Sequence, residues 1–121
     1  MKKIFKYVLL TLTLFPIYAH GADFINGLED IPIMEGLEQQ YSDAISFGNE
    51  ESRLVEAILK GNKVKFASVE KFYQDTLPHM GWSYQGRKKN TLVFYRDRES
   101  LEISRLERNP LTIRITVKSK N

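Results

Sequence analysis

Arginine offers more binding chemistry than any other residue type in this sequence, and it is concentrated in the second half of the chain. Its planar guanidinium group presents several N–H donors in a fork that matches carboxylate and phosphate groups. Four basic residues on predicted strands form the candidate binding surface: Arg96, Arg105, Arg114 and Lys118. If Arg105 and Arg114 share an open sheet face, they could bind an anionic polymer. The alternative is a solvated sheet face whose charges prevent strand edges from pairing.

A catalytic hypothesis rests on two residues. Asp75 lies one helical turn before His79, and a serine hydrolase needs such a base and carboxylate beside its nucleophile. No serine, however, lies in a strained, glycine-flanked turn. A histidine near the C-terminal end of a helix also has a structural role, because its positive charge is stabilised there. No catalytic residue is therefore predicted.

Metal and cofactor chemistry find little support. The chain has no cysteine, which excludes thiolate metal sites and thiol catalysis. Two adjacent acidic pairs, Glu29 with Asp30 and Glu50 with Glu51, lack the repeating spacing of a calcium loop. Paired carboxylates could serve a glycosidase, but chance pairing is common in an acid-rich chain. No glycine-rich phosphate loop occurs, and no cofactor or metal is predicted.

The N-terminus has the layout of an export signal. Residues 1–6 carry three lysines, residues 7–19 are uncharged and mostly apolar, and small residues stand at Ala19, Gly21 and Ala22. This order predicts a secretory signal peptide, residues 1–21, cleaved before Ala22. The apolar run is shorter than the ~20 residues needed to cross a membrane, so no membrane span is expected after cleavage. Export, most simply to the periplasm of a Gram-negative cell, is the predicted location.

Cleavage would change the charge balance. Three of the 18 basic residues lie in the leader and none of the 15 acidic residues does, so the mature chain has 15 of each. A net charge near zero gives no reason to expect nucleic acid as a partner. Residues 22–59 nevertheless hold nine acids and one base, and residues 60–121 hold 14 bases and six acids. Either the two halves neutralise each other in one fold, or the second half presents a basic face to an anionic envelope component.

The pattern predicts one domain after an N-terminal arm. Residues 22–41 are apolar but lack a sustained period, which favours an extended arm that docks on the domain or is donated to a partner. Residues 42–121 are predicted to form a single α+β domain. Without cysteine, this domain must be stabilised by packing and not by disulfides.

One amphipathic helix organises the domain. Ser68 is its predicted N-cap, and apolar residues then recur with helical spacing up to Met80. Pro78 should end the regular helix, and Gly81 should allow a sharp turn into a strand. The fold class is therefore α+β: an antiparallel sheet of four to six strands with one main helix on one face, in β-α-β-β-β-β order. The predicted strands are 43–47, 52–60, 82–86, 91–96, 101–106 and 111–118.

The segments IPIMEGL and FYQDTLPHMGW and the strand-rich C-terminal part resemble small uncharacterised exported (periplasmic) proteins of Gram-negative bacteria with a FYxxxLPxxGW-type helix-to-strand motif. The resemblance covers most of the mature chain. It implies an exported α+β domain of the cell envelope and brings no known active site with it.

Three functions are compatible with these observations. The leading hypothesis is a non-catalytic envelope domain that binds a protein or anionic envelope component through its sheet face or N-terminal arm. The first alternative is a small-ligand carrier with an apolar pocket between helix and sheet, and the second is a small hydrolase using Asp75 and His79. Partner identity and oligomeric state leave no signal in the sequence.

Overall fold

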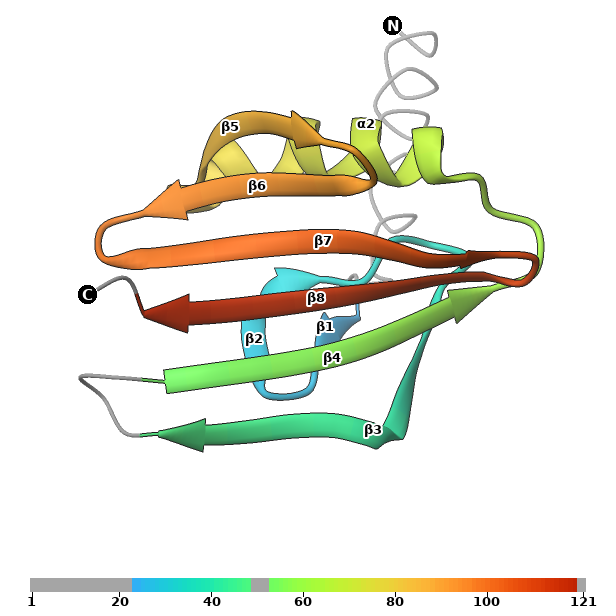
Figure 1. Ribbon diagram of the computed structural model, residues 1–121, viewed down its shortest axis with the longest axis horizontal. Coiled ribbons are helices and arrows are strands. Elements are labelled where there is room, and N and C mark those ends of the chain that lie inside the picture. The colour runs from blue at the N-terminus through green and yellow to red at the C-terminus, as the bar shows by residue number, and fades with distance from the viewer. Residues whose placement is uncertain (1–22, 49–52, 120–121) are drawn as a thin grey trace, which may run out of the picture.

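The computed structural model describes residues 23–48 and 53–119, apart from the side chains of residues 42–47. The predicted signal peptide, residues 1–21, lies outside this part. The described chain has an α+β fold, as predicted, with a six-stranded and a two-stranded antiparallel sheet and one α-helix (Figure 1).

The elements follow one another with four strands on each side of the helix. They are β1 (Phe24–Ile25), β2 (Leu28–Pro32), β3 (Glu38–Gly48), β4 (Arg53–Gly61), α2 (Phe66–Thr76), the 3-10 helix η2 (Leu77–Met80), β5 (Ser83–Lys88), β6 (Thr91–Arg96), β7 (Glu99–Arg108) and β8 (Leu111–Ser119). The main sheet has the spatial order β3-β4-β8-β7-β6-β5. The predicted β-α-β-β-β-β order has one strand before the helix, and the predicted strands 43–47 and 52–60 give two; the structure has four there.

The central strands show the alternating burial of side chains that is typical of a sheet with one buried face. In β8 the residues Leu111, Ile113, Ile115 and Val117 are buried, at most 2% exposed, whereas their neighbours Arg114 and Lys118 point away. The register places this buried row beside the buried rows of β4 and β7. One face of the sheet is therefore continuously apolar, as the period of two predicts.

A small hairpin, β1–β2, packs on the same apolar face as the helix. Its turn contains Gly27, whose φ of 95° favours glycine. Ile25, Leu28 and Ile31 enter the common core. The buried hydroxyl of Tyr73 on α2 donates a 2.7 Å hydrogen bond to the carbonyl oxygen of Pro32. Burial raises the pKa of this phenol well above its usual value, which keeps the donor protonated.

The 41/42 boundary between the predicted arm and domain falls inside β3, because this strand begins at Glu38. The start of β3 is also tied to the hairpin. The side chain of Gln39 accepts from the amide of Asn26 at 2.8 Å and donates to its carbonyl oxygen at 3.2 Å. Residues 23–41 therefore include both the hairpin and the beginning of the main sheet.

The helix begins earlier than predicted. Its N-cap is Lys65, which has extended backbone angles and makes no capping hydrogen bond through its side chain, so Ser68 lies inside the first turn. Phe66 is buried, which explains why the helical face starts there. The predicted end is confirmed: α2 ends at Thr76, Pro78 lies in the first turn of η2, and Gly81 closes η2 with a φ of 89°.

Ser68→Ala should therefore leave stability within about 0.5 kcal/mol of the wild type, because Ser68 is exposed and caps nothing. Loss of a true serine N-cap would cost about 0.5–2 kcal/mol. Urea unfolding of the two proteins measures the difference. A loss of more than about 1 kcal/mol would restore the cap assignment.

Large aromatic side chains fill the space between the helix and the sheet. Tyr73, Trp82 and Phe94 are each at most 2% exposed and belong to one core cluster. Phe72 lies at the edge of this cluster, with its ring 4.8 Å from that of Tyr73. A packed layer of this kind stabilises the fold through burial of apolar area.

Candidate functional site

The four residues of the predicted binding surface lie in different places. Arg114 and Lys118 project from β8 on the sheet face opposite the helix. Arg105 pairs in register with the buried Ile113 and so lies on the helix face. Arg96 also lies on that face, stacked on Trp82. The structure therefore does not bring Arg105 and Arg114 onto one open face.

On the open face, which is the sheet face opposite the helix, carboxylates lie close to the basic side chains of β8. Arg114 lies 3.5 Å from the carboxylate of Glu56, and Lys118 lies 3.9 Å from that of Glu102. The first of these pairs joins the acidic first half of the chain to the basic second half. Because Arg114 and Lys118 already face carboxylates, they offer little attraction to an anionic polymer.

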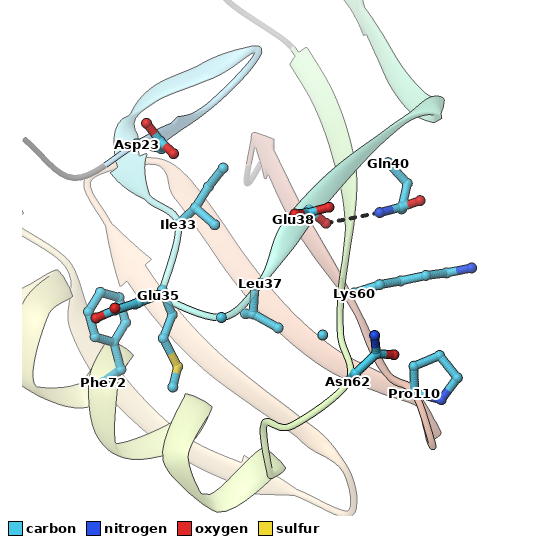
Figure 2. Close-up of a pocket in the computed structure, with 13 residues that line it drawn as sticks. Asp23, Ile33, Glu35, Leu37, Glu38, Gln40, Lys60, Asn62, Phe72 and Pro110 are labelled. Atoms are coloured by element: carbon cyan, nitrogen blue, oxygen red, sulfur yellow. Dashed lines mark hydrogen bonds between the residues drawn. The ribbon is translucent and has the colours of Figure 1, made fainter.

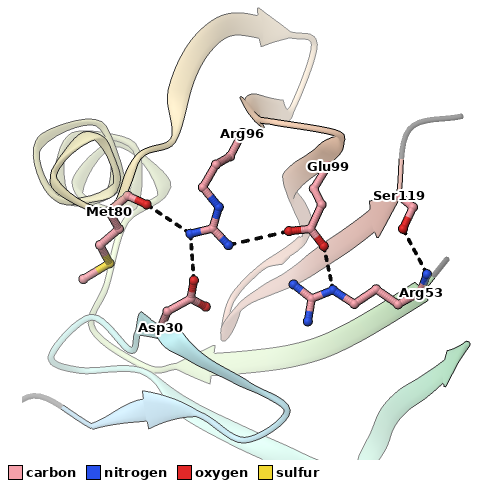
Figure 3. A network of polar contacts seen from close by, with 6 residues as sticks. All are labelled: Asp30, Arg53, Met80, Arg96, Glu99 and Ser119. Atoms are coloured by element: carbon pink, nitrogen blue, oxygen red, sulfur yellow. Dashed lines mark hydrogen bonds and ion pairs between the residues drawn. The ribbon is translucent and has the colours of Figure 1, made fainter. Parts of the chain in front are cut away.

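Arg96 is held in a network that fastens the β1–β2 hairpin to the sheet (Figure 3). Its guanidinium carbon lies 4.1 Å from the centre of the Trp82 ring. One guanidinium nitrogen is 2.7 Å from Asp30 and donates to the carbonyl oxygen of Met80 at 3.0 Å. The other lies 3.6 Å from Glu99, which also binds Arg53 at 2.6 Å. These contacts give Arg96 a structural role.

Arg96→Ala is expected to destabilise the domain by about 1–2 kcal/mol, because it removes a charge-assisted hydrogen bond and the stacking on Trp82. Lys118→Ala, which removes only an exposed pair, should cost about 0.5 kcal/mol or less. Urea unfolding of both variants checks the contrast. Equal losses would mean that the network contributes nothing beyond a surface ion pair.

A different set of basic residues does converge. We call it the cationic pocket: a hollow of about 380 Å³ whose charged lining residues are Lys65, Arg87, Arg105 and Arg108. They come from the start of α2, the end of β5 and the end of β7. Figure 1 shows the start of α2 and the β7–β8 turn at the same end of the molecule.

Two irregularities in the strands create this convergence. Arg105 and Arg108 are three residues apart and would lie on opposite faces of a regular strand. A register shift between Arg105 and Glu107 instead pairs Arg108 with the buried Leu111. A second shift between Tyr84 and Gly86 pairs Arg87 with the buried Leu92. Both bulges thus turn arginines toward the helix side of the sheet.

The pocket is arranged around the ring of Phe66. The guanidinium carbons of Arg87 and Arg105 lie 5.3 Å and 5.6 Å from its centre, within the range of cation–π attraction. Arg87 is also fixed by the carbonyl oxygen of Lys89 at 2.8 Å and by the carboxylate of Glu70 at 3.1 Å. Two guanidinium groups are therefore positioned before any ligand arrives.

Positive charge in the pocket exceeds negative charge. Among the described residues, Glu70 is the one carboxylate that pairs with any of the four bases, and its partner is Arg87. Lys65, Arg105 and Arg108 make no ion pair in that part of the chain. The helix adds to the imbalance, since its first turn holds no acidic residue and its N-terminal end carries partial positive charge.

A second hollow, of about 900 Å³, has the opposite character (Figure 2). Its rim includes the carboxylates of Asp23, Glu35 and Glu38, with Lys60 as the basic residue among those that line it. Leu37, Ile33, Phe72 and Pro110 contribute apolar surface. Its excess of carboxylates makes it a poor site for an anion.

The residues of the hydrolase hypothesis are not assembled. The carboxylate of Asp75 is paired with Lys71 at 2.9 Å and is largely exposed. His79 is also exposed, and no hydrogen bond joins it to Asp75 in the part of the chain that the structure describes. Neither residue lines the cationic pocket or the larger hollow.

Residues 23–48 and 53–119 contain no candidate metal site and no helix that could cross a membrane. No group of three or more histidine or acidic side chains there could hold a metal ion. None of the helices in these ranges has the length and apolar character needed to cross a membrane.

Comparison of the chain with protein families, curated proteins and solved structures finds no match. The resemblance to exported envelope proteins therefore stays a prediction. What defines the protein is its α+β fold, with a helix and a hairpin on one face of a six-stranded antiparallel sheet and a cationic pocket at one end.

Proposed function

We propose that the protein is an exported, non-catalytic domain of the cell envelope that binds an anionic envelope component in the cationic pocket. The observation that carries the proposal is the convergence of four basic side chains in one hollow with a single paired carboxylate. Export rests on the predicted leader. Anion binding was expected at the sheet face or the arm, but the geometry favours the helix side of the sheet.

The pocket suits a partner that presents one anionic group at a time. Arg87 and Arg105 are stacked on Phe66, so little side-chain freedom is lost when a ligand binds. Arg108 is exposed at the rim, where it can meet the ligand first. Excess positive charge in a hollow raises the local concentration of anions and speeds their association.

The two alternatives have less support. A carrier with an apolar pocket between helix and sheet would need space that Tyr73, Trp82 and Phe94 occupy. A hydrolase would need Asp75 to orient His79, whereas Asp75 is paired with Lys71. The cationic pocket contains neither of these residues, so the proposed binding function is independent of them.

Retention on an immobilised polyanion tests the proposal. The mature chain, residues 22–121, should be retained at low salt although its basic and acidic residues balance. Arg108→Glu should elute at clearly lower salt. Arg98→Glu changes the net charge equally but lies in the β6–β7 turn outside the pocket, so it should elute close to the wild type. No retention, or equal shifts for the two variants, would contradict the proposal.

A further inference from the structure

We infer that the anionic group recognised in the cationic pocket is a phosphate monoester, either on a small molecule or on a headgroup. The inference rests on the proposed anion-binding function and adds the chemical class of the ligand. Charge, donor arrangement and the size of the hollow carry it.

The charge of the pocket fits a dianion better than a monoanion. Lys65, Arg105 and Arg108 are without an ion-pair partner in the described part of the chain, and Arg87 already shares Glu70. A carboxylate or a phosphodiester brings one negative charge and would leave most of this repulsion between like charges in place. A phosphate monoester carries close to two negative charges at neutral pH and offsets more of it.

The donors around the hollow suit a group with several acceptor oxygens. Arg105 and Arg108 each present a guanidinium fork on the same side of the sheet, because the bulge after Arg105 turns both toward α2. The first amides of a helix have no intrahelical acceptor, and the Phe66 and Ala67 segment lines the hollow. The guanidinium groups are the essential donors, and the helix end adds to them.

The size of the hollow leaves room for what carries the phosphate. About 380 Å³ is at the lower end of the range for small-molecule sites. Val64, Phe66 and Leu111 supply apolar wall beside the basic residues. The hollow therefore accommodates a phosphate with a compact organic group and is too small for an extended stretch of polymer.

Binding of defined anions to the mature chain tests the inference. The soluble probes are glycerol 3-phosphate as the monoester, dimethyl phosphate as the diester and succinate as the dicarboxylate. The vesicle probes are phosphatidylcholine containing either phosphatidic acid, a monoester headgroup, or phosphatidylglycerol, a diester headgroup. Arg108→Glu and Arg98→Glu serve as pocket and charge-matched control variants.

The monoester, in soluble or vesicle form, should bind at least tenfold more tightly than the corresponding diester and than succinate. Arg108→Glu should remove this preference and Arg98→Glu should keep it. Binding should weaken as the pH falls through ~6, where the monoester takes up its second proton and loses one negative charge. Glu70, the carboxylate that pairs with Arg87, lies beside the pocket in every binding experiment, so it does not favour one probe over another.

The outcomes separate the source of the phosphate from the validity of the inference. Preference for the soluble monoester identifies a free small molecule, and preference confined to phosphatidic acid vesicles identifies a headgroup; both support the inference. Equal binding of the diester or of succinate, with the same loss in Arg108→Glu, overturns the inference and leaves the proposed function intact. Binding of none of the five probes overturns both.

Discussion

Reversing the charge of two pocket arginines, Arg105→Glu/Arg108→Glu, should weaken binding to an anion by at least about a hundredfold. Each hydrogen bond to a charged group contributes about 1.5–3 kcal/mol, and each new carboxylate adds repulsion. Arg105 is only partly buried and Arg108 is exposed, so the fold should tolerate the change. Affinity for an immobilised polyanion, measured beside urea unfolding, gives both quantities.

The matched control for this double variant is Lys88→Glu/Arg98→Glu. It alters the net charge equally, and neither position lines the cationic pocket. If this control lost as much affinity as the pocket variant, binding would depend on the overall charge of the second half and not on the pocket. If the pocket variant alone unfolded at lower urea, Arg108→Gln would separate binding from stability, because it removes one exposed charge and adds none.

Gly61→Ala should cause the largest loss of stability among single changes that add only a methyl group. Gly61 ends β4, and a Cβ atom there would meet the carbonyl oxygen of Gly36 and the side chain of Leu37. A backbone atom cannot move aside as a flexible side chain can, so the segment that leads into β3 would have to shift. Overpacking of this kind costs about 1–3 kcal/mol.

The neighbouring Asn62→Ala is the control for Gly61→Ala, since Asn62 is exposed and its change should stay within about 0.5 kcal/mol. Urea unfolding midpoints of the two variants and the wild type measure the difference. Equal stability of Gly61→Ala and the wild type would show that residues 36 and 37 do not pack against the end of β4 as closely as described.

The regular elements were predictable because their burial follows a simple period. In β8, apolar and polar residues alternate without exception from Leu111 to Lys118, and one face is buried. Along α2 and into η2, Val69, Tyr73 and Leu77 recur at helical spacing and all are buried. The helix start was misplaced because the burial of Phe66 outweighs the capping preference of Ser68.

The pocket was not predictable from the same reasoning. A period of two assigns Arg105 and Arg108 to opposite faces, and only a bulge, which leaves no clear mark in the sequence, returns them to one face. The predicted surface therefore contained Arg105 but replaced its true neighbours with Arg96 and Arg114. The guanidinium group of Arg96 instead stacks on Trp82 and pairs with Asp30.

Hydrophobic periodicity also could not predict the short β1–β2 hairpin. The strand β1 has two residues, too few to show an alternation, and Asn26 and Gly27 indicated only a turn. What holds the hairpin is long-range: its apolar side chains enter the core, and Tyr73 bonds to Pro32 across 41 residues of sequence. Such long-range contacts cannot be predicted from the local sequence, because they form only when the helix and the sheet pack together.

The most direct test of the cationic pocket is a map of amide chemical shifts in the mature chain as inorganic phosphate is added. The account predicts that the largest saturable changes occur at Phe66, Ala67, Arg105 and Arg108, and that they disappear in Arg105→Glu/Arg108→Glu. Largest changes on the open face, around Arg114 and Thr116, or no saturable change at all, would contradict it.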